Sequence, residues 1–126
     1  ATLPTDALTK FRDTMKEVEG LGFETVKAQQ LELGQRVRKL LADKGYNSVA
    51  AEGFEAPGVV VSYTADADVH TGKKFLAQGL QVAAGVPLQC DEPADYQTFR
   101  IGLFGLDKLA NIDRTVAHLE GALSKV

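Results

Sequence analysis

The stretch YQTFRIGLFG, residues 96–105, is typical of a β-strand that ends at two glycines and carries one arginine among apolar residues. Successive side chains of a strand point to opposite faces. The apolar set that would share one face comprises Phe99, Ile101 and Leu103. We expect this face to lie on the core. Thr98, Arg100 and Gly102 share the other face, so a fixed positive charge stands in the middle of the predicted sheet.

Two interpretations of Arg100 follow from its neighbours. If the second face of the sheet is open to water, Arg100 is an ordinary surface residue. Gly102 favours another interpretation, because a missing side chain inside a strand often marks the close approach of a ligand or of another backbone. An arginine beside such a clearing is suited to bind a carboxylate through two parallel hydrogen bonds. On the residues alone, both interpretations stay open.

Apolar residues spaced three and four apart predict two long helices in the first third of the chain. The first begins at the capping residue Thr5 and ends at Gly20 and Gly22. Its apolar stripe consists of Leu8, Phe11, Met15 and Val18. The second occupies residues 23–44 and stops at Gly45 in a left-handed conformation. Its expected buried face comprises Val26, Leu33, Val37, Leu40 and Leu41.

Four short strands, a short helix and a longer C-terminal helix are predicted in the rest of the chain. The strands are residues 48–52, 59–64, 80–84 and 98–103. A turn and a helix within residues 65–79 are capped by Asp66 or Asp68. The side chains expected to be buried there are Val69, Phe75 and Leu76. The last helix lies in residues 106–126 with Asp107 as its cap. Its apolar stripe comprises Leu109, Ile112, Val116, Leu119 and Leu123.

The order of these elements predicts the fold class. Two helices, two strands, a helix, two strands and a helix suggest an α+β fold, with a small, largely antiparallel sheet of about four strands and helices on one face. A chain of 126 residues is long enough to bury its own core without a disulfide or a metal. We therefore expect residues 1–126 to form a single domain.

Composition excludes several classes of protein. The chain is 44% hydrophobic and 25% charged, with a formal net charge of −3, and this acidic balance argues against a nucleic-acid partner. No apolar run approaches the roughly 18 residues of a membrane span, and the N-terminus does not resemble a signal peptide. A single cysteine, Cys90, cannot form an intramolecular disulfide. We expect a reducing, cytoplasmic setting and no membrane partner.

The other reactive side chains show no pattern of a metal or catalytic site. His70 and His118 are far apart in sequence, and neither has a second metal ligand at helical spacing or an identifiable proton-transfer partner. Cys90 is followed by two carboxylates, which would raise the pKa of its thiol. Lys73 and Lys74 are adjacent on a polar helix, whereas a lysine that forms a Schiff base is normally desolvated.

The stretch TFRIGLFGLDKLANIDRTVAHLEGAL, residues 98–123, resembles the C-terminal end of the class V aminotransferases, which bind pyridoxal phosphate. The resemblance is closest to the alanine–glyoxylate and serine–glyoxylate branch, and the 2-aminoethylphosphonate–pyruvate transaminases end in a similar way. The shared elements are the Arg-Ile-Gly strand at 100–102, a second glycine at Gly105, and an amphipathic helix that begins with Ile-Asp-Arg at 112–114. Segments within residues 1–46 are similar to the crossover into the family's small domain and to its next helix.

The resemblance implies that residues 1–126 are the C-terminal small domain of a longer aminotransferase. In the family, the arginine of this strand binds the α-carboxylate of the substrate. Arg100 would take that role, with Gly102 as the clearance beside it. The cofactor, the lysine that holds it and its phosphate-binding loops belong to a large domain that is absent here. We therefore expect no catalytic or cofactor-binding residue in this chain and no activity from it alone.

The same resemblance describes the parent enzyme. It implies a cytoplasmic homodimer that uses pyridoxal 5'-phosphate to transfer an amino group from an amino acid such as alanine or serine. The acceptor would be a 2-oxo acid such as glyoxylate or pyruvate. The partners of the present chain would then be its own missing large domain and these small substrates. An apolar surface that normally packs on the large domain should be exposed, and the first helix is the expected place.

Two other classes of function stay open. The chain is alternatively a stand-alone α+β module that binds an amino acid for sensing or regulation, again through Arg100. In the third interpretation it is a structural domain, and Arg100 forms only a surface ion pair worth less than about 1 kcal/mol.

Overall fold

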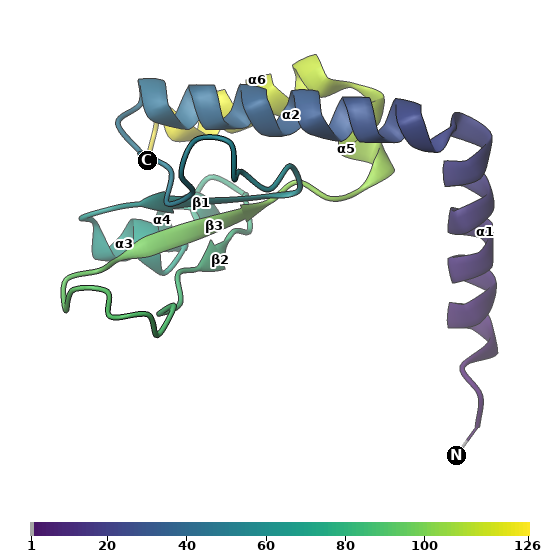
Figure 1. The fold of residues 1–126 in the computed structure, drawn as a ribbon, viewed down its shortest axis with the longest axis horizontal. Helices are drawn as coiled ribbons and strands as arrows, with labels where there is room; N and C mark the ends of the chain where they lie inside the picture. The colour runs from purple at the N-terminus through teal and green to yellow at the C-terminus, as the bar shows by residue number, and fades with distance from the viewer. Residues whose placement is uncertain (1) are drawn as a thin grey trace.

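The computed structural model describes residues 2–126, which form six helices and one three-stranded sheet (Figure 1). The helices are α1 (Thr5–Leu21), α2 (Phe23–Asp43), α3 (Ala67–His70), α4 (Lys73–Leu76), α5 (Leu106–Ala110) and α6 (Ile112–Leu123). The strands are β1 (Val59–Tyr63), β2 (Ala83–Ala84) and β3 (Thr98–Gly102). The α+β class and the antiparallel sheet are as predicted, but the described residues form three strands where about four were expected.

β3 is the central strand of the sheet, with β1 on one side and β2 on the other. Both neighbours run antiparallel to it. Ile101 lies opposite Val60 on the face that packs on the core, whereas Arg100 lies between Val61 of β1 and Ala83 of β2 on the other face. The alternation of the sequence therefore determines which face of β3 each residue occupies.

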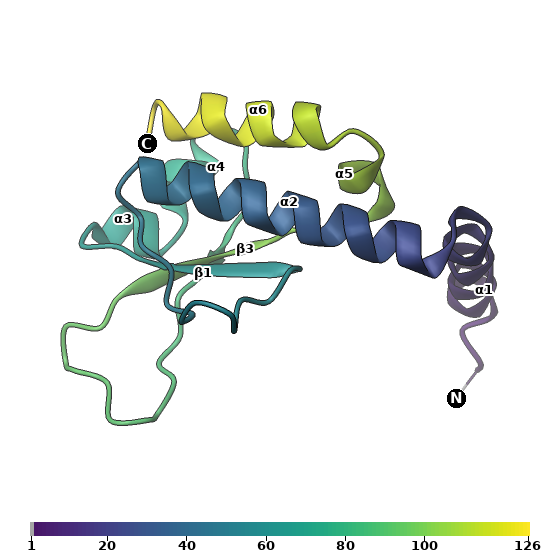
Figure 2. The ribbon, with the colours of Figure 1, turned by 45° about the horizontal axis from the view of Figure 1, so that its top comes forward.

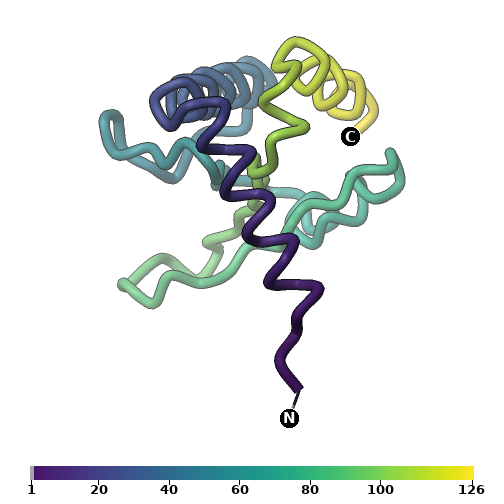
Figure 3. Tube along the Cα trace, turned by 90° about the vertical axis from the view of Figure 1, so that its right-hand side faces the viewer, coloured from purple at the N-terminus to yellow at the C-terminus, as the bar shows by residue number. Residues whose placement is uncertain are grey.

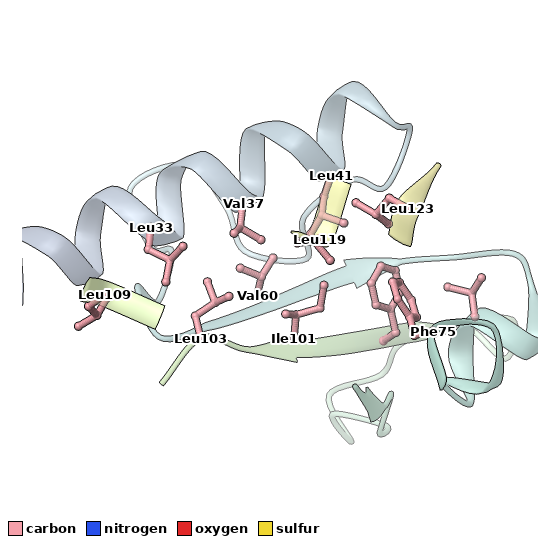
Figure 4. Packing of buried hydrophobic residues seen from close by; sticks show 12 residues of the cluster. Leu33, Val37, Leu41, Val60, Phe75, Ile101, Leu103, Leu109, Leu119 and Leu123 are labelled. Atoms are coloured by element: carbon pink, nitrogen blue, oxygen red, sulfur yellow. The ribbon is translucent and has the colours of Figure 1, made fainter. Parts of the chain in front are cut away.

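The core lies between the sheet and the pair of helices α2 and α6, which run side by side over one face of the sheet (Figure 2). The buried apolar residues of this core include Leu33, Val37 and Leu41 of α2, Phe99 and Ile101 of β3, and Leu119 and Leu123 of α6 (Figure 4). α3 and α4 add Val69 and Phe75 to the same cluster. The predicted core side chains Phe99, Ile101 and Leu103 are 0%, 7% and 3% exposed, which confirms that prediction.

Arg38 of α2 fastens the loop that precedes β1. Its guanidinium donates hydrogen bonds to the hydroxyl of Ser48 at 2.9 Å, to the carbonyl of Ala56 at 2.8 Å and to the carbonyl of Val59 at 3.0 Å. Partial burial lowers the pKa of Arg38, and a charge on Glu55 opposes that shift. The charge of Arg38 therefore has a structural partner, namely the backbone of the loop.

The predicted strand at residues 48–52 was wrong. Only a short stretch runs beside β1: the amide of Val49 donates to the carbonyl of Val61 at 3.0 Å, and the amide of Tyr63 donates to the carbonyl of Asn47 at 2.9 Å. Residues 50–53 then turn away, and Gly53 adopts a positive φ of 86°. The segment contacts the sheet edge through a single bridge and does not form a further strand.

The predicted C-terminal helix is broken into α5 and α6 at Asn111. This residue leaves the helical conformation, with φ −148° and ψ 84°, and its side-chain oxygen accepts a hydrogen bond from the amide of Arg114 at 3.0 Å. Asn111 therefore caps α6, as asparagine commonly does at a helix start. Asp107 does not cap α5, because Gly105 precedes that helix and no side chain caps it.

Three smaller predictions were also wrong. The strand expected at 80–84 is reduced to its last two residues. Leu76 is 65% exposed, because α4 is a single turn that directs Phe75 into the core. Thr5 does not cap α1; Pro4 occupies that position, and the Thr5 hydroxyl donates to the carbonyl of Leu3 instead.

α1 turns away from the direction of α2 and stands apart from the body of the domain (Figures 1 and 3). None of its residues is buried, and Leu8, Phe11 and Met15 are 48%, 62% and 49% exposed. The apolar stripe predicted for the first helix is therefore present but lies outside the core of its own domain. None of the helices in residues 2–126 combines the length and the apolar character that crossing a membrane requires.

Candidate carboxylate-binding site

Arg100 is half-buried in the middle of β3, on the sheet face opposite the core. Its Nε donates a hydrogen bond of 2.9 Å to the carbonyl of Ala84 in the neighbouring strand. Because this bond uses one edge of the planar guanidinium, it fixes the direction in which the two terminal nitrogens point. The edge strand β2 thus orients the arginine that the sequence singles out.

The charge of Arg100 has no counter-ion among residues 2–126. No carboxylate oxygen of that part of the chain lies within 4.0 Å of its guanidinium, and its two terminal nitrogens have no hydrogen-bond partner there. Arg36 shows the contrast, because its Nη1 lies 2.6 Å from the carboxylate of Asp113. A half-buried guanidinium with unused donors can bind an anion that the described chain does not supply.

Gly102 opens the sheet surface next to Arg100. It is exposed, and a Cβ placed on it would meet only the ring of Phe104, at 3.8 Å. Since its backbone does not adopt a positive φ, the glycine is not required by the chain conformation. Its missing side chain instead leaves the surface beside the arginine uncovered.

The other end of the same face is closed. Thr98 is only 1% exposed, and a Cβ on Gly85 would lie 2.1 Å from the carbonyl oxygen of Thr98. His70 also contacts this carbonyl, through Nδ1 at 2.6 Å. The face expected to hold Thr98, Arg100 and Gly102 is therefore open only towards Gly102, and His70 has a packing role at its closed end.

The lysines of the described chain do not fit covalent attachment of pyridoxal phosphate. A Schiff-base lysine needs a lowered pKa, but the pKa of Lys74 is raised by its hydrogen bond to Asp66, whose oxygen lies 2.5 Å from Nζ. Lys73 lies 3.6 Å from Asp68. No lysine within residues 2–126 is buried. The lysines of the described residues therefore do not fit this cofactor.

Cys90 is exposed and lies in a loop whose backbone amides donate hydrogen bonds to the carboxylate of Glu92. That carboxylate accepts hydrogen bonds from the amides of Leu88, Gln89 and Cys90 at 2.6, 2.9 and 2.8 Å. These bonds lower the pKa of Glu92 to about 2. Desolvation of the thiol and the neighbouring Glu92 raise the pKa of Cys90, which is the wrong direction for a nucleophile.

His118 lines a groove that includes Gly102 but not Arg100, and that the sequence did not predict. The groove has a volume of about 450 Å³ and lies between α5, α6, residues 80–82 and the end of β3. With Val37 of α2, five separate segments build it, so no local pattern could have revealed it. Within residues 2–126, no three His, Cys, Asp or Glu side chains gather closely enough to hold a metal ion.

Comparison with known proteins does not identify a family for this chain. No protein-family model matches the chain, and no curated protein matches it. The resemblance of residues 98–123 to class V aminotransferases therefore supports a proposal rather than a family assignment.

Proposed function

We propose that the chain is the C-terminal small domain of a pyridoxal-phosphate-dependent aminotransferase, and that Arg100 binds the α-carboxylate of its substrates. The observation that carries the proposal is the state of Arg100. Its guanidinium is half-buried, is oriented by the carbonyl of Ala84, and has no carboxylate partner among the described residues. A bidentate hydrogen-bonded pair with a substrate carboxylate would complete this arrangement.

The exposed stripe of α1 supports a second, larger domain in the same protein. Leu8, Phe11 and Met15 lie on one helix face that the small domain does not cover. Contiguous apolar surface of this kind normally marks an interface. In the proposal the large domain covers it, carries the cofactor and its lysine, and belongs to a cytoplasmic homodimer.

Arg100 has a positioning role in this proposal. An arginine held by the sheet would fix the carboxylate end of an amino acid or a 2-oxo acid and so hold the reacting carbon at the cofactor. Alanine, serine, glyoxylate and pyruvate all carry the required carboxylate. The cofactor supplies the electron sink for transamination when it is bound to the large domain.

Substitution of Arg100 in the full-length enzyme tests the proposal. Arg100→Ala should raise KM for the amino donor and lower kcat/KM. The loss of transition-state stabilisation should be about 2–4 kcal/mol, because the substrate loses a charged hydrogen-bonded partner. Arg100→Lys should recover only part of this loss, since lysine cannot form the bidentate pair. Lys44→Ala, at an exposed lysine at the end of α2, is the matched control. Unchanged kinetics for Arg100→Ala would overturn the proposal.

A stand-alone amino-acid-binding module is the second candidate, and the self-contained core of the domain favours it. In that case the isolated chain should bind alanine or serine by itself, and Arg100→Ala should abolish the binding. In the aminotransferase proposal the isolated chain binds these amino acids only weakly. It also forms no stoichiometric, borohydride-trappable adduct with pyridoxal phosphate, so such an adduct would contradict the inactivity of the chain alone.

A further inference from the structure

The groove beside α6 has an apolar floor and a polar rim. Its volume of about 450 Å³ lies within the range of roughly 300–1,000 Å³ that is typical of small-molecule sites. The floor includes Val37, Ile101, Leu103 and Leu119, each of which is 7% exposed or less. An apolar ligand body that enters the groove would therefore contact side chains of the domain core.

The shortness of β2 creates this groove. β2 pairs with only two residues of β3, so residues 80–82 diverge from the end of the central strand. The amide of Leu103 donates to the carbonyl of Gly58 and therefore faces β1. Because backbone groups alternate in direction along a strand, the N–H and C=O of Gly102 face the groove, where no strand pairs with them.

The rim of the groove carries more positive than negative charge. Lys108 and Arg114 line it, and Asp107 is the one acidic residue among the lining residues. Lys108 Nζ donates to the carbonyl of Phe104 at 2.7 Å, and Arg114 Nη2 donates to the carbonyl of Asp107 at 3.2 Å. Within residues 2–126, neither cation has a carboxylate oxygen within 4.0 Å. Both therefore retain donors for an anion.

We propose that this groove binds a small amphipathic carboxylate, with its apolar body on the floor and its carboxylate at Lys108 and Arg114. The combination of a buried apolar floor and unpaired cations on one rim selects this class of ligand over a neutral or cationic one. The groove borders the Arg100 site at Gly102, but Arg100 itself does not line it. The proposal for the groove therefore does not depend on the aminotransferase proposal.

Titration of the ¹⁵N-labelled chain with three probes of eight carbon atoms each tests the site. Octanoate should shift the amides of Gly102, Leu103, Thr115 and Leu119 in a saturable way. Octan-1-ol and octylammonium should bind at least about tenfold more weakly, because the charged hydrogen bonds are lost or reversed. Equal affinity for the three probes would show that only apolar contact is measured and would overturn the proposal. Shifts confined to α1 would overturn it as well.

Variants assign the binding to the rim and the floor. The double variant Lys108→Gln/Arg114→Gln should weaken octanoate binding by about tenfold or more while leaving the octan-1-ol affinity unchanged. Lys27→Gln, an exposed lysine of α2 that does not line the groove, is the matched control and should bind octanoate as the wild type does.

Gln81→Trp adds a second test that keeps the rim charges. Gln81 is exposed at the groove, so a tryptophan there should fill the space and abolish binding without disturbing the core. Arg100→Gln should leave octanoate binding unchanged, which separates this site from the proposed substrate site. Unaltered octanoate affinity in both the double variant and Gln81→Trp would refute the groove as the binding site.

Discussion

α1 and α2 are consecutive helices with the same kind of sequence pattern, but only α2 packs its apolar face into the core. Both carry apolar residues at spacings of three and four, and only Gly22, with φ +93°, separates them. α2 buries Leu33, Val37 and Leu41 against the sheet, whereas α1 buries no residue. Periodicity therefore predicts that a helix has an apolar face, but what covers that face depends on the elements that lie across from it.

The largest expected effect is on the free energy of unfolding when one large apolar side chain is truncated in each helix. Leu33→Ala in α2 removes a side chain that is 0% exposed, so we expect it to lower the free energy of unfolding by about 2–5 kcal/mol. Leu8→Ala in α1, at 48% exposure, should change it by less than about 0.5 kcal/mol. Denaturant titration of both variants measures the difference. Similar losses would mean that α1 belongs to the same cooperative core.

A pair of glycine substitutions gives a smaller contrast of opposite sign. A Cβ on Gly34 of α2 would lie 2.7 Å from the carbonyl oxygen of Pro57, whereas a Cβ on Gly20 of α1 would meet nothing within 4 Å. Gly34→Ala should therefore cost about 1–3 kcal/mol through overpacking. Gly20→Ala should stabilise the helical state of α1 by about 0.5–1 kcal/mol. Unfolding curves test Gly34→Ala, and helix content measured by circular dichroism tests Gly20→Ala. If Gly34→Ala left the stability unchanged, the close approach of Gly34 to Pro57 would be disproved.

Self-association of the isolated chain should depend on α1 alone. Burying one large apolar side chain at an interface stabilises it by about 1.5–3 kcal/mol, so Phe11→Glu should weaken association at least about tenfold. Phe54→Glu, at a side chain that is 85% exposed in the loop before β1, is the control. Sedimentation equilibrium measures both. A wild-type chain that stays monomeric at high concentration would contradict an interface on α1.

Acid should loosen one loop while both long helices keep their structure, and this is the smallest expected effect. The depressed pKa of Glu92 means that its carboxylate stabilises the loop fully above the ordinary value of 4.5, and that this contribution is lost as pH falls through about 2. The amides of Leu88, Gln89 and Cys90 should shift with that midpoint in NMR spectra. Glu92→Gln should remove the transition, and a midpoint near 4.5 in the wild type would show that the three hydrogen bonds do not form in solution.

Local patterns predicted the parts of the fold that depend on short stretches of sequence. Alternation identified the core face of β3, including Phe99, and the apolar stripes identified the long helices. Asp66 caps α3 as expected, and Gly45 adopts the expected positive φ of 90°. These features need only neighbours within one or two turns, so the sequence contains the information directly.

Features that depend on distant partners could not be predicted. Residues 47–49 follow β1 only briefly, and Arg38 of the distant helix α2 holds the loop at Ser48, Ala56 and Val59. Thr98 is buried, although it shares a face with Arg100, because residues 83–85 cover it. At the candidate site, sequence reasoning identified Arg100 and Gly102, but the hydrogen bond to Ala84 and the groove beside α6 arise from strand pairing and packing.

The central claim is that the α1 stripe and Arg100 both face a larger domain of the same protein. Determining the reading frame upstream of Ala1 tests this claim most directly. We predict that the frame continues for about 200 residues or more, with a lysine that follows a strand and is suited to bind pyridoxal phosphate. A start codon immediately before Ala1 would contradict the claim and would favour a stand-alone binding module.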